Sequence, residues 1–351
     1  MSAARRRHTE QDRRVQFWRT GSPRLGAAPP ETDPLRAAAG RIRAVFADAG
    51  CTGRLHARRC DLGAAGEGPP GGGAEIEVDG RARVVTASVD KLVLLVAFCR
   101  AVEAGRIDPV ARLTVDPAEC TPGPTGLAAL RDPVTMSRRD LATSMMTVSD
   151  NAAADVLLGE IGLGAVEELV AELGLTGTRI VGGTADVHRG LLRDTDTHTT
   201  AEAFAALADN DEAHTVSAYD PAYTSATTPE EMTRLLRALW AGRVLSPAQT
   251  AFVRSVMAAQ VWPHRIAAAF PHRGVTVAGK TGTIGVIRNE VAVVEFPGEH
   301  PVAVAVFTHA ARADPTLPVV DAAIAEAARI AVTALRRPLD PAAAPEPDTC
   351  R

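Results

Sequence analysis

The chain has 351 residues, of which 46% are hydrophobic and 23% charged, a balance typical of a soluble protein that buries a large core. Its formal net charge of −4 argues against a nucleic-acid-binding body. The arginine-rich start is interpreted as a solvated arm, and no apolar stretch follows it as in a signal peptide or a membrane anchor. We therefore expect a cytoplasmic protein without nucleic-acid or membrane partners. The five cysteines lack the spacing of a metal site, and we expect no metal and no cofactor.

The first part of the chain predicts an arm, a helix and two strands. Residues 1–34 mix Arg, Gly and Pro without periodicity and are expected to be disordered. Residues 35–46 place their apolar side chains on one helical face, which predicts an amphipathic helix. Residues 54–60 and 75–85 alternate as strands do, and a Gly/Pro-rich segment connects them.

The middle of the chain is predicted to be helical. Helical patterns begin at Ser88, where the segment is apolar nearly all round as in a buried helix, and at Ser137, where Asp140 completes a capping box. Residues 176–228 are weakly patterned and contain one convincing helix, 201–208. The other predicted helices cover residues 152–161, 164–173, 229–241 and 247–261.

The last part of the chain predicts strands, a helix and a disordered tail over residues 338–351. The strands cover residues 275–279, 291–296 and 302–308, and the helix covers residues 319–335. Strands at both ends of the chain with helices between them predict an α+β fold, in which an antiparallel sheet is flanked by helices and carries an inserted all-helical lobe. The α/β lobe is expected from residues 35–87 and 226–337, and the helical lobe from residues 88–225 with an extended loop over 176–228.

Ser88 and Lys91 form the first motif that carries chemistry. Residues i and i+3 are neighbours on one helical face, and a serine hydroxyl becomes a good nucleophile when a base within hydrogen-bonding distance removes its proton. A lysine buried at the head of an apolar helix has a lowered pKa and serves as such a base. On its own, however, Ser-x-x-Lys more often describes two solvated helix residues.

Two further motifs follow in the chain. Ser149-Asp150-Asn151 precedes a predicted helix, where these residue types are common N-caps. Lys280-Thr281-Gly282-Thr283 ends a predicted strand, with a glycine that allows close approach to the backbone. Each motif alone has an ordinary structural explanation.

In this fixed order, the three motifs resemble the signature of class A β-lactamases and penicillin-binding proteins. The resemblance covers about residues 35–335, because the segments around Asp132, Leu141, Thr227 and Leu245 are also similar to the family. It implies a β-lactamase/transpeptidase-like fold, a small-molecule substrate and a monomer.

The resemblance also implies residue roles. Ser88 is the acylated nucleophile, Lys91 its general base and Ser149 a proton relay to the leaving nitrogen. Asn151 holds the substrate amide, and Lys280 supplies positive potential. Binding of a substrate carboxylate and the oxyanion is expected from Thr281, Gly282, Thr283 and Arg288, with the backbone amides of Ser88 and Thr283 forming the oxyanion hole.

The sequence departs from the family at the step that releases the acyl group. Class A β-lactamases carry a Glu-x-x-Leu-Asn motif whose glutamate activates water, whereas this chain has Thr184 near that position and no such motif. Asp186 is the nearest carboxylate and the candidate replacement. Asp90, where the family has an apolar residue, is expected to raise the pKa of Lys91. We expect acylation to be intact and deacylation to be slow or carried by another residue.

Three functions remain open at this point. The first is hydrolysis of a β-lactam or a related amide or ester. The second is a biosynthetic esterase or acyltransferase of the same fold, which the expected cytoplasmic location favours. The third is a penicillin-binding protein that retains its acyl group as a sensor or sink.

Overall fold

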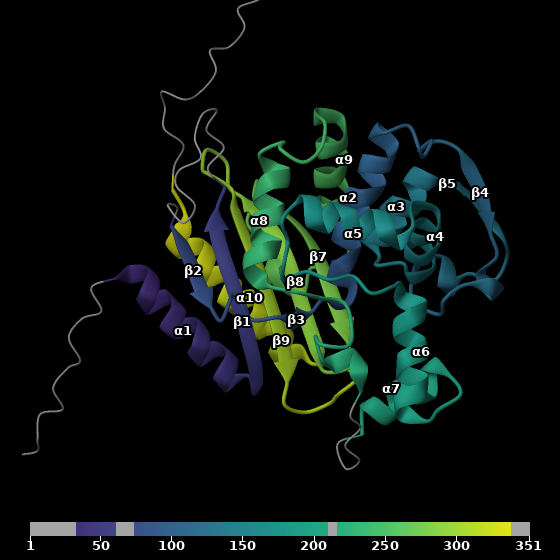
Figure 1. The fold of residues 1–351 in the computed structure, drawn as a ribbon. Coiled ribbons are helices and arrows are strands. Elements are labelled where there is room, and N and C mark those ends of the chain that lie inside the picture. Colours follow the sequence, from purple (N-terminus) through teal and green to yellow (C-terminus); the bar gives the residue numbers. More distant parts are fainter. Residues whose placement is uncertain (1–32, 61–73, 210–215, 338–351) are drawn as a thin grey trace, which may run out of the picture. The chain divides into compact units, whose positions relative to one another are not determined.

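A five-stranded antiparallel sheet, with strand order β2-β1-β9-β8-β7, forms the centre of the computed structural model (Figure 1). The structure describes residues 33–60, 74–209 and 216–337. The strands are β1 (Cys51–Arg59), β2 (Glu75–Val78), β7 (Thr276–Ile284), β8 (Ile287–Glu295) and β9 (Val302–Ala310). Because β1 pairs along its whole length with β9, the first strands complete the sheet of the last ones. The predicted α+β fold is confirmed.

Both faces of the sheet are buried. Successive residues of β8 alternate between two cores: Val291 and Val293 face one, whereas Ala292 and Val294 face the other, as the two-residue period of a strand requires. Strands buried on both sides are apolar almost continuously, which explains why their sequences lack a strong polar alternation.

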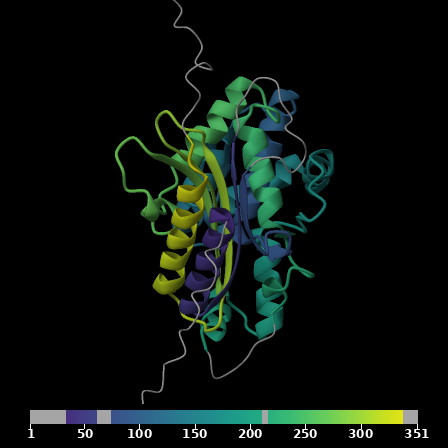
Figure 2. The same cartoon turned by 90° about the vertical axis from the view of Figure 1, so that its left-hand side faces the viewer.

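Two helices cover one face of the sheet. Helices α1 (Pro34–Asp48) and α10 (Pro318–Leu335) pack against each other and against this face, as Figure 2 shows. The buried side chains of α1 include Ile42 and Phe46, which the sequence placed on its apolar face. The first and the last helix of the described residues therefore meet in this layer.

The remaining helices lie on the other face or continue from it. Helix α2 (Asp90–Glu103) is buried nearly all round, as predicted. The others are α3 (Arg138–Thr147), α4 (Asn151–Ile161), α5 (Leu163–Glu172), α8 (Pro229–Trp240) and α9 (Pro247–Ala258). Together with α2 and one face of the sheet they enclose the largest apolar core of the described residues.

Two short antiparallel strand pairs lie outside the central sheet, and their pairing was not predicted. Strand β3 (Val84–Val85) pairs with β6 (Ala226–Thr227), and β4 (Arg112–Val115) pairs with β5 (Val134–Ser137). The predicted strand 75–85 is interrupted at Asp79, whose φ of 47° turns the chain. The β3–β6 pair joins the chain just before Ser88 to the chain just before α8.

The prediction of an extended loop over residues 176–228 is wrong. This segment contains α7 (Thr200–Leu207), close to the predicted helix, and also the unpredicted helix α6 (Thr184–Thr195). Helix α6 starts after Gly183 and contains Gly190, and glycine is an unfavourable residue for a helix. Tertiary packing stabilises it instead, because Leu191 is fully buried in a third apolar cluster.

The strand that carries the third motif is longer than predicted. Strand β7 extends to Ile284, so Lys280-Thr281-Gly282-Thr283 lies within the strand and not at its end. The predicted disordered arm and tail lie, apart from residues 33 and 34, outside the described residues, and the lobe boundaries at residues 87 and 226 stay a prediction. No helix in the described part of the chain is long and apolar enough to cross a membrane.

Candidate active site

Ser88 lies in a short 3-10 turn, Ala87–Val89, that leads directly into helix α2. The preceding residue, Ala87, has a left-handed backbone with a φ of 45°, a conformation that costs a non-glycine residue about 1–2 kcal/mol. The buried Asn289 of strand β8 holds the chain before the turn, because its Nδ2 donates to the carbonyl oxygen of Val85 at 2.9 Å. The turn that carries Ser88, the predicted nucleophile, is thus tied to the sheet.

Strand β7 approaches the same turn at Gly282. A Cβ added at Gly282 would lie 2.7 Å from the carbonyl oxygen of Thr86 and 3.3 Å from the Cβ of Ala87. The first distance is shorter than real Cβ atoms tolerate, so a side chain would push the strand and the turn apart. The glycine of the third motif therefore allows the edge of β7 to lie beside Ser88.

The Ser149 hydroxyl lies between the two lysines of the motifs. Lys280 Nζ donates to Ser149 Oγ at 3.0 Å, and Lys91 Nζ lies 3.4 Å from the same oxygen. Lys91 Nζ also donates to the carbonyl oxygen of Ser149 at 2.7 Å and to Asn151 Oδ1 at 2.8 Å. Four of the predicted site residues, from three separate motifs, therefore share one hydrogen-bond network.

Asp150 fixes the backbone that presents Ser149. Ser149 has a φ of 59°, which is unusual for a residue with a side chain. The fully buried Asp150 carboxylate accepts hydrogen bonds from Leu127 N at 2.8 Å, Ser144 Oγ at 2.7 Å and Ala153 N at 3.1 Å. The surrounding structure thus maintains a strained residue at the reactive centre.

Burial disfavours the charged form of both lysine side chains. Lys91 is 2% exposed and Lys280 is fully buried. Burial lowers the pKa of Lys91 to about 8, although the negative charge of Asp90 acts in the opposite direction. Burial and the nearby Lys91 charge lower the pKa of Lys280 well below its usual value. With a pKa of 8, about one Lys91 side chain in ten is neutral at pH 7, which is sufficient for a general base.

The outer edge of β7 faces the site. Strand β7 is the last strand of the sheet, and Thr281 N donates away from the sheet to Gln260 Oε1 at 2.7 Å. Because backbone groups repeat with a period of two along a strand, the N–H of Thr283 points to the same side. This N–H and the N–H of Ser88 are the donors for which an oxyanion hole was predicted.

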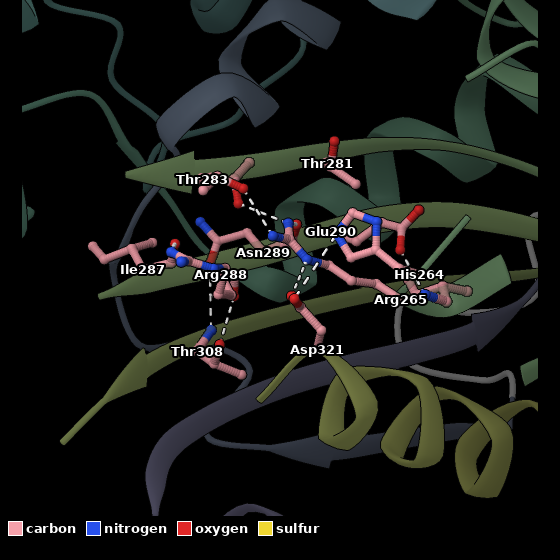
Figure 3. A network of polar contacts seen from close by, with 12 residues as sticks. His264, Arg265, Thr281, Thr283, Ile287, Arg288, Asn289, Glu290, Thr308 and Asp321 are labelled. Atoms are coloured by element: carbon pink, nitrogen blue, oxygen red, sulfur yellow. Dashed lines mark hydrogen bonds and ion pairs between the residues drawn. The ribbon is translucent and has the colours of Figure 1, made fainter. Parts of the chain in front are cut away.

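Arg265 was not predicted, yet it reaches the site, as Figure 3 shows. Its Nη2 donates to Thr283 Oγ1 at 2.8 Å, and its Nη1 donates to the carbonyl oxygens of Gly282 and Asn289 at 2.9 and 2.8 Å. Its Nε donates to the Asp321 carboxylate on α10 at 2.6 Å. A hydroxyl that accepts from a guanidinium directs its own proton elsewhere, so Thr283 is prepared to donate to a ligand.

Arg288 lies on β8, the strand next to β7. Its Nη1 donates to the carbonyl oxygens of Gly285 and Ile287, at the turn between β7 and β8. In Figure 3 its side chain points along the sheet, away from Thr283. The geometry therefore favours Arg265 over Arg288 as the arginine that acts on a bound carboxylate.

The half-buried amide of Gln260 and the buried carboxylate of Glu290 lie behind Thr281. Gln260 Oε1 accepts hydrogen bonds from both the backbone N and the Oγ1 of Thr281, while its Nε2 donates to Glu290 at 3.1 Å. Burial raises the pKa of Glu290 to about 7. The Thr281 hydroxyl thus donates within the protein, so of the two motif threonines Thr283 is the one available as a donor.

The start of α6 lies where the resemblance placed the missing glutamate. Asp155 of α4 holds this start, because its carboxylate accepts from Thr184 N at 2.7 Å and from Ala185 N at 2.9 Å. The candidate base Asp186 caps the same helix through Gly183 N at 2.9 Å, pairs with Arg189 and is half exposed. The carboxylates whose charges act on Lys91 are instead Asp90, Asp150 and Asp155.

Sequence reasoning missed Arg265, Gln260, Asn289 and Asp155. Arg265 and Gln260 lie in the segment that follows helix α9, where no periodicity distinguishes a buried side chain from a solvated one. Asn289 carried one available signal, a polar residue between apolar residues of a predicted strand region. Asp155, four residues after Asn151, lies on the same helical face, and this spacing was the signal that could have identified it.

Comparison with known proteins identifies the family of the chain. Residues 37–335 match the model of the "Beta-lactamase enzyme family". A curated relative, the β-lactamase regulatory protein BlaB of Streptomyces cacaoi, is 31% identical over 272 residues, which are 73% of this chain and 87% of that protein.

Solved structures share the fold. A β-lactamase from Sphaerobacter thermophilus is 24% identical with a TM-score of 0.65, over 86% of this chain and 97% of its own. PBP-A is 22% identical with a TM-score of 0.66, over 88% of this chain and 98% of its own. A class A β-lactamase described as the last common ancestor of Gram-negative bacteria is 24% identical with a TM-score of 0.67, over 85% of this chain and 99% of its own. From the family match over most of its length, the chain belongs to the β-lactamase enzyme family.

Proposed function

We propose that this protein is a penicillin-binding serine hydrolase that forms an acyl ester on Ser88 with a β-lactam and hydrolyses it slowly. The observation that supports this most directly is the Ser149 hydroxyl between Lys91 and Lys280, 3.4 and 3.0 Å from their Nζ atoms. This geometry offers a route for a proton from the nucleophile to a leaving nitrogen.

In the acylation step, Ser88 Oγ bonds to the lactam carbonyl carbon while neutral Lys91 accepts the proton of the Ser88 hydroxyl. The C–N bond then breaks, and the nitrogen takes a proton from Ser149, which is resupplied by the lysines. Lys280, whose Nζ donates to Ser149 Oγ at 3.0 Å, orients the hydroxyl on this path. The lowered pKa of Lys91, to about 8, makes it both able to accept the proton and able to return it.

Binding uses the edge of β7. The N–H groups of Ser88 and Thr283 stabilise the oxyanion, and the Thr283 hydroxyl, oriented by Arg265, donates to the substrate carboxylate. Asn151 remains the proposed partner of the substrate amide, since its side chain is half-buried at the start of α4 and accepts from Lys91.

Slow release follows from the segment that begins at Thr184. It lacks the glutamate that clears the ester in class A enzymes, and Asp186 is engaged in capping and an ion pair. Among the solved structures of similar fold is an L158E mutant of PBP-A described as an acyl-enzyme complex with penicillin G.

A second candidate is a β-lactam-responsive regulator, which the relative from Streptomyces cacaoi favours because it is described as a β-lactamase regulatory protein. Both candidates begin with the same acylation of Ser88 and differ in what happens afterwards. In a regulator the ester persists and changes a partner interaction. In a hydrolase it turns over.

The test is intact-mass measurement after mixing with benzylpenicillin. The wild type is expected to gain the mass of one penicillin molecule and to lose it over minutes or longer, while Ser88→Ala gains nothing. Multiple turnovers without a detectable adduct would identify an efficient β-lactamase. Hydrolysis of acetyl or butyryl esters without any adduct would favour the biosynthetic esterase instead. The cytoplasmic location and the monomeric state stay predictions.

A further inference from the structure

The outer edge of strand β7 offers a ligand the backbone groups of one residue. Because β7 is the last strand of its sheet, the outward N–H and C=O groups have no neighbouring strand. Thr281 and Thr283 both face outward, since backbone groups repeat with a period of two. At Thr281 the N–H donates to Gln260 Oε1 at 2.7 Å, and the carbonyl oxygen accepts from Lys280 Nζ at 2.8 Å. Among the residues that the structure describes, none pairs with the outward backbone groups of Thr283.

The edge is closed on both sides of Thr283. In one direction, β7 ends at Ile284 and the chain turns at Gly285, which has a φ of 49°. In the other direction, the next outward residue is Thr281, about 7 Å away in a strand that rises by about 3.4 Å per residue. Gln260 occupies its N–H. A ligand that pairs with Thr283 therefore finds no second residue to pair with.

The Gln260 side chain is held in this position by a buried carboxylate. Its Nε2 donates to Glu290 at 3.1 Å, and Glu290 is 1% exposed and also accepts from Ile266 N at 2.6 Å. Because the amide nitrogen is directed to Glu290, the amide oxygen is directed to Thr281, where it accepts from both the N–H and the hydroxyl. The closure is thus built from three side chains and not from one exposed glutamine.

The closed part of the edge adjoins the reactive centre. On one side of Thr281 is Lys280, whose Nζ lies 3.0 Å from Ser149 Oγ. On the other side is Gly282, where an added Cβ would lie 3.3 Å from the Cβ of Ala87, the residue before the predicted nucleophile. A substrate that extends along β7 from Ser88 toward Lys280 would therefore need the place that Gln260 fills.

We infer that Gln260 determines the class of acyl donor, by closing the edge of β7 at Thr281 and excluding extended peptides. An extended peptide binds to a sheet edge as an added strand, through main-chain hydrogen bonds at every second residue. A compact acyl donor such as a β-lactam needs only one residue of the edge, with the N–H of Thr283 at its oxyanion and the carbonyl oxygen of Thr283 at one amide. The inference rests on the proposed acylation of Ser88.

The experiment compares a short and a long thioester. The short one is the N-benzoylglycyl thioester of mercaptoacetic acid, and the long one carries two further alanine residues at each end. In both, Ser88 Oγ bonds to the carbonyl carbon, the C–S bond breaks, and the sulfur leaves as a free thiol with the serine proton. Release of this thiol gives kcat/KM, which reports acylation.

In wild type, the long thioester should react no faster than the short one. In Gln260→Ala, the ratio of the two kcat/KM values, long over short, should rise about tenfold, because the freed N–H of Thr281 can donate to the longer peptide. A merely structural loss would lower both values together and leave their ratio unchanged. Gln249→Ala, the same change at a half-buried glutamine of helix α9, is the matched control and should keep the wild-type ratio.

Glu290→Gln provides a second route to the same result. The new amide oxygen still accepts from Ile266 N, so its NH2 group faces Gln260, whose own amide must turn its oxygen toward that group. Gln260 then no longer accepts from Thr281, and the ratio should rise as in Gln260→Ala. Labelling by benzylpenicillin shows whether each variant is folded.

Three results would overturn the inference: a long thioester that reacts tenfold faster than the short one in wild type, a wild-type ratio in the folded variants, or no reaction of the long thioester with any of the proteins. If neither variant folds, the wild-type comparison decides alone. A wild type that benzylpenicillin never acylates contradicts the proposed function itself. A wild type that is acylated while Gln260→Ala keeps the wild-type ratio contradicts only the role of Gln260.

Discussion

The guanidinium of Arg265 donates from Nη2 to the hydroxyl oxygen of Thr283 at 2.8 Å. Arg265 comes from the segment after α9 and Thr283 is the last residue but one of β7, yet the contact decides which way the hydroxyl proton points. With one lone pair of the oxygen occupied by the guanidinium, the proton is directed away from Arg265, toward the open edge of the strand.

Arg265→Lys should therefore slow acylation by benzylpenicillin about tenfold or more, because an ammonium cannot reproduce the fork of donors. The effect should be much smaller with the methyl ester of the same penicillin, which lacks the carboxylate. Measuring both substrates in wild type and Arg265→Lys gives a thermodynamic cycle, in which the loss of the guanidinium and the loss of the substrate carboxylate are measured singly and together. If Arg288→Lys produced the larger carboxylate-dependent loss, the assignment of Arg265 would be wrong.

Acylation should depend on pH through Lys91. The pKa of this lysine is lowered to about 8 by burial, and only the neutral amine accepts a proton. The second-order rate constant for acylation should therefore rise with pH up to about 8 and level off above it. Rapid-quench mass measurements between pH 6 and 9.5 test this, and a rate that is constant over the whole range would exclude Lys91 as the base.

Gly282→Ala should reduce acylation at least about a hundredfold, since a displacement of the catalytic parts by about 1 Å has effects of that size. The new methyl group would lie 2.7 Å from the carbonyl oxygen of Thr86, forcing β7 away from the turn. Gly159→Ala, in helix α4 with open space around its Cβ position, is the matched control. It should keep the wild-type rate and gain about 0.5–1 kcal/mol of stability.

Asp155→Ala should destabilise the protein by about 2–4 kcal/mol, because it leaves the N–H groups of Thr184 and Ala185 and the Thr121 hydroxyl without their charged acceptor. Asp155→Asn should lose less, since an amide oxygen still accepts. Urea unfolding of the three proteins measures the difference. Equal free energies of unfolding for Asp155→Ala and wild type would show that the start of α6 is held by other contacts.

Much of the fold could be predicted from the sequence, because the signals were local. The amphipathic face of α1, the apolar circumference of α2 and the capping residues of α3 each determine an element within a few turns. Helix α6 could not be predicted, since a glycine cap and an internal glycine weaken its local signal while burial of Leu191 stabilises it from outside.

The candidate site likewise has residues that motifs predict and residues that only the tertiary structure places. The residues expected from motifs, Ser149, Asn151, Lys91 and Lys280, are brought into one network. The role of Arg288 stays a prediction, because its position in the sequence says which strand it occupies and not which carbonyl groups its guanidinium contacts. Arg288 donates to the carbonyl oxygens of Gly285 and Ile287. The contact of Arg265 with Thr283 depends on tertiary structure alone.

The side chain of Asn289 that supports the nucleophile turn has a consequence for how the protein matures. It joins Val85 to a residue 204 positions later, and β1 likewise finds its long partner only in β9. Contacts of such sequence separation form late and slowly. A chain still emerging from the ribosome contains Ser88 and Lys91 long before it can place them. Under the proposed function, labelling by a penicillin would therefore mark molecules whose synthesis and folding have reached the last strands of the sheet.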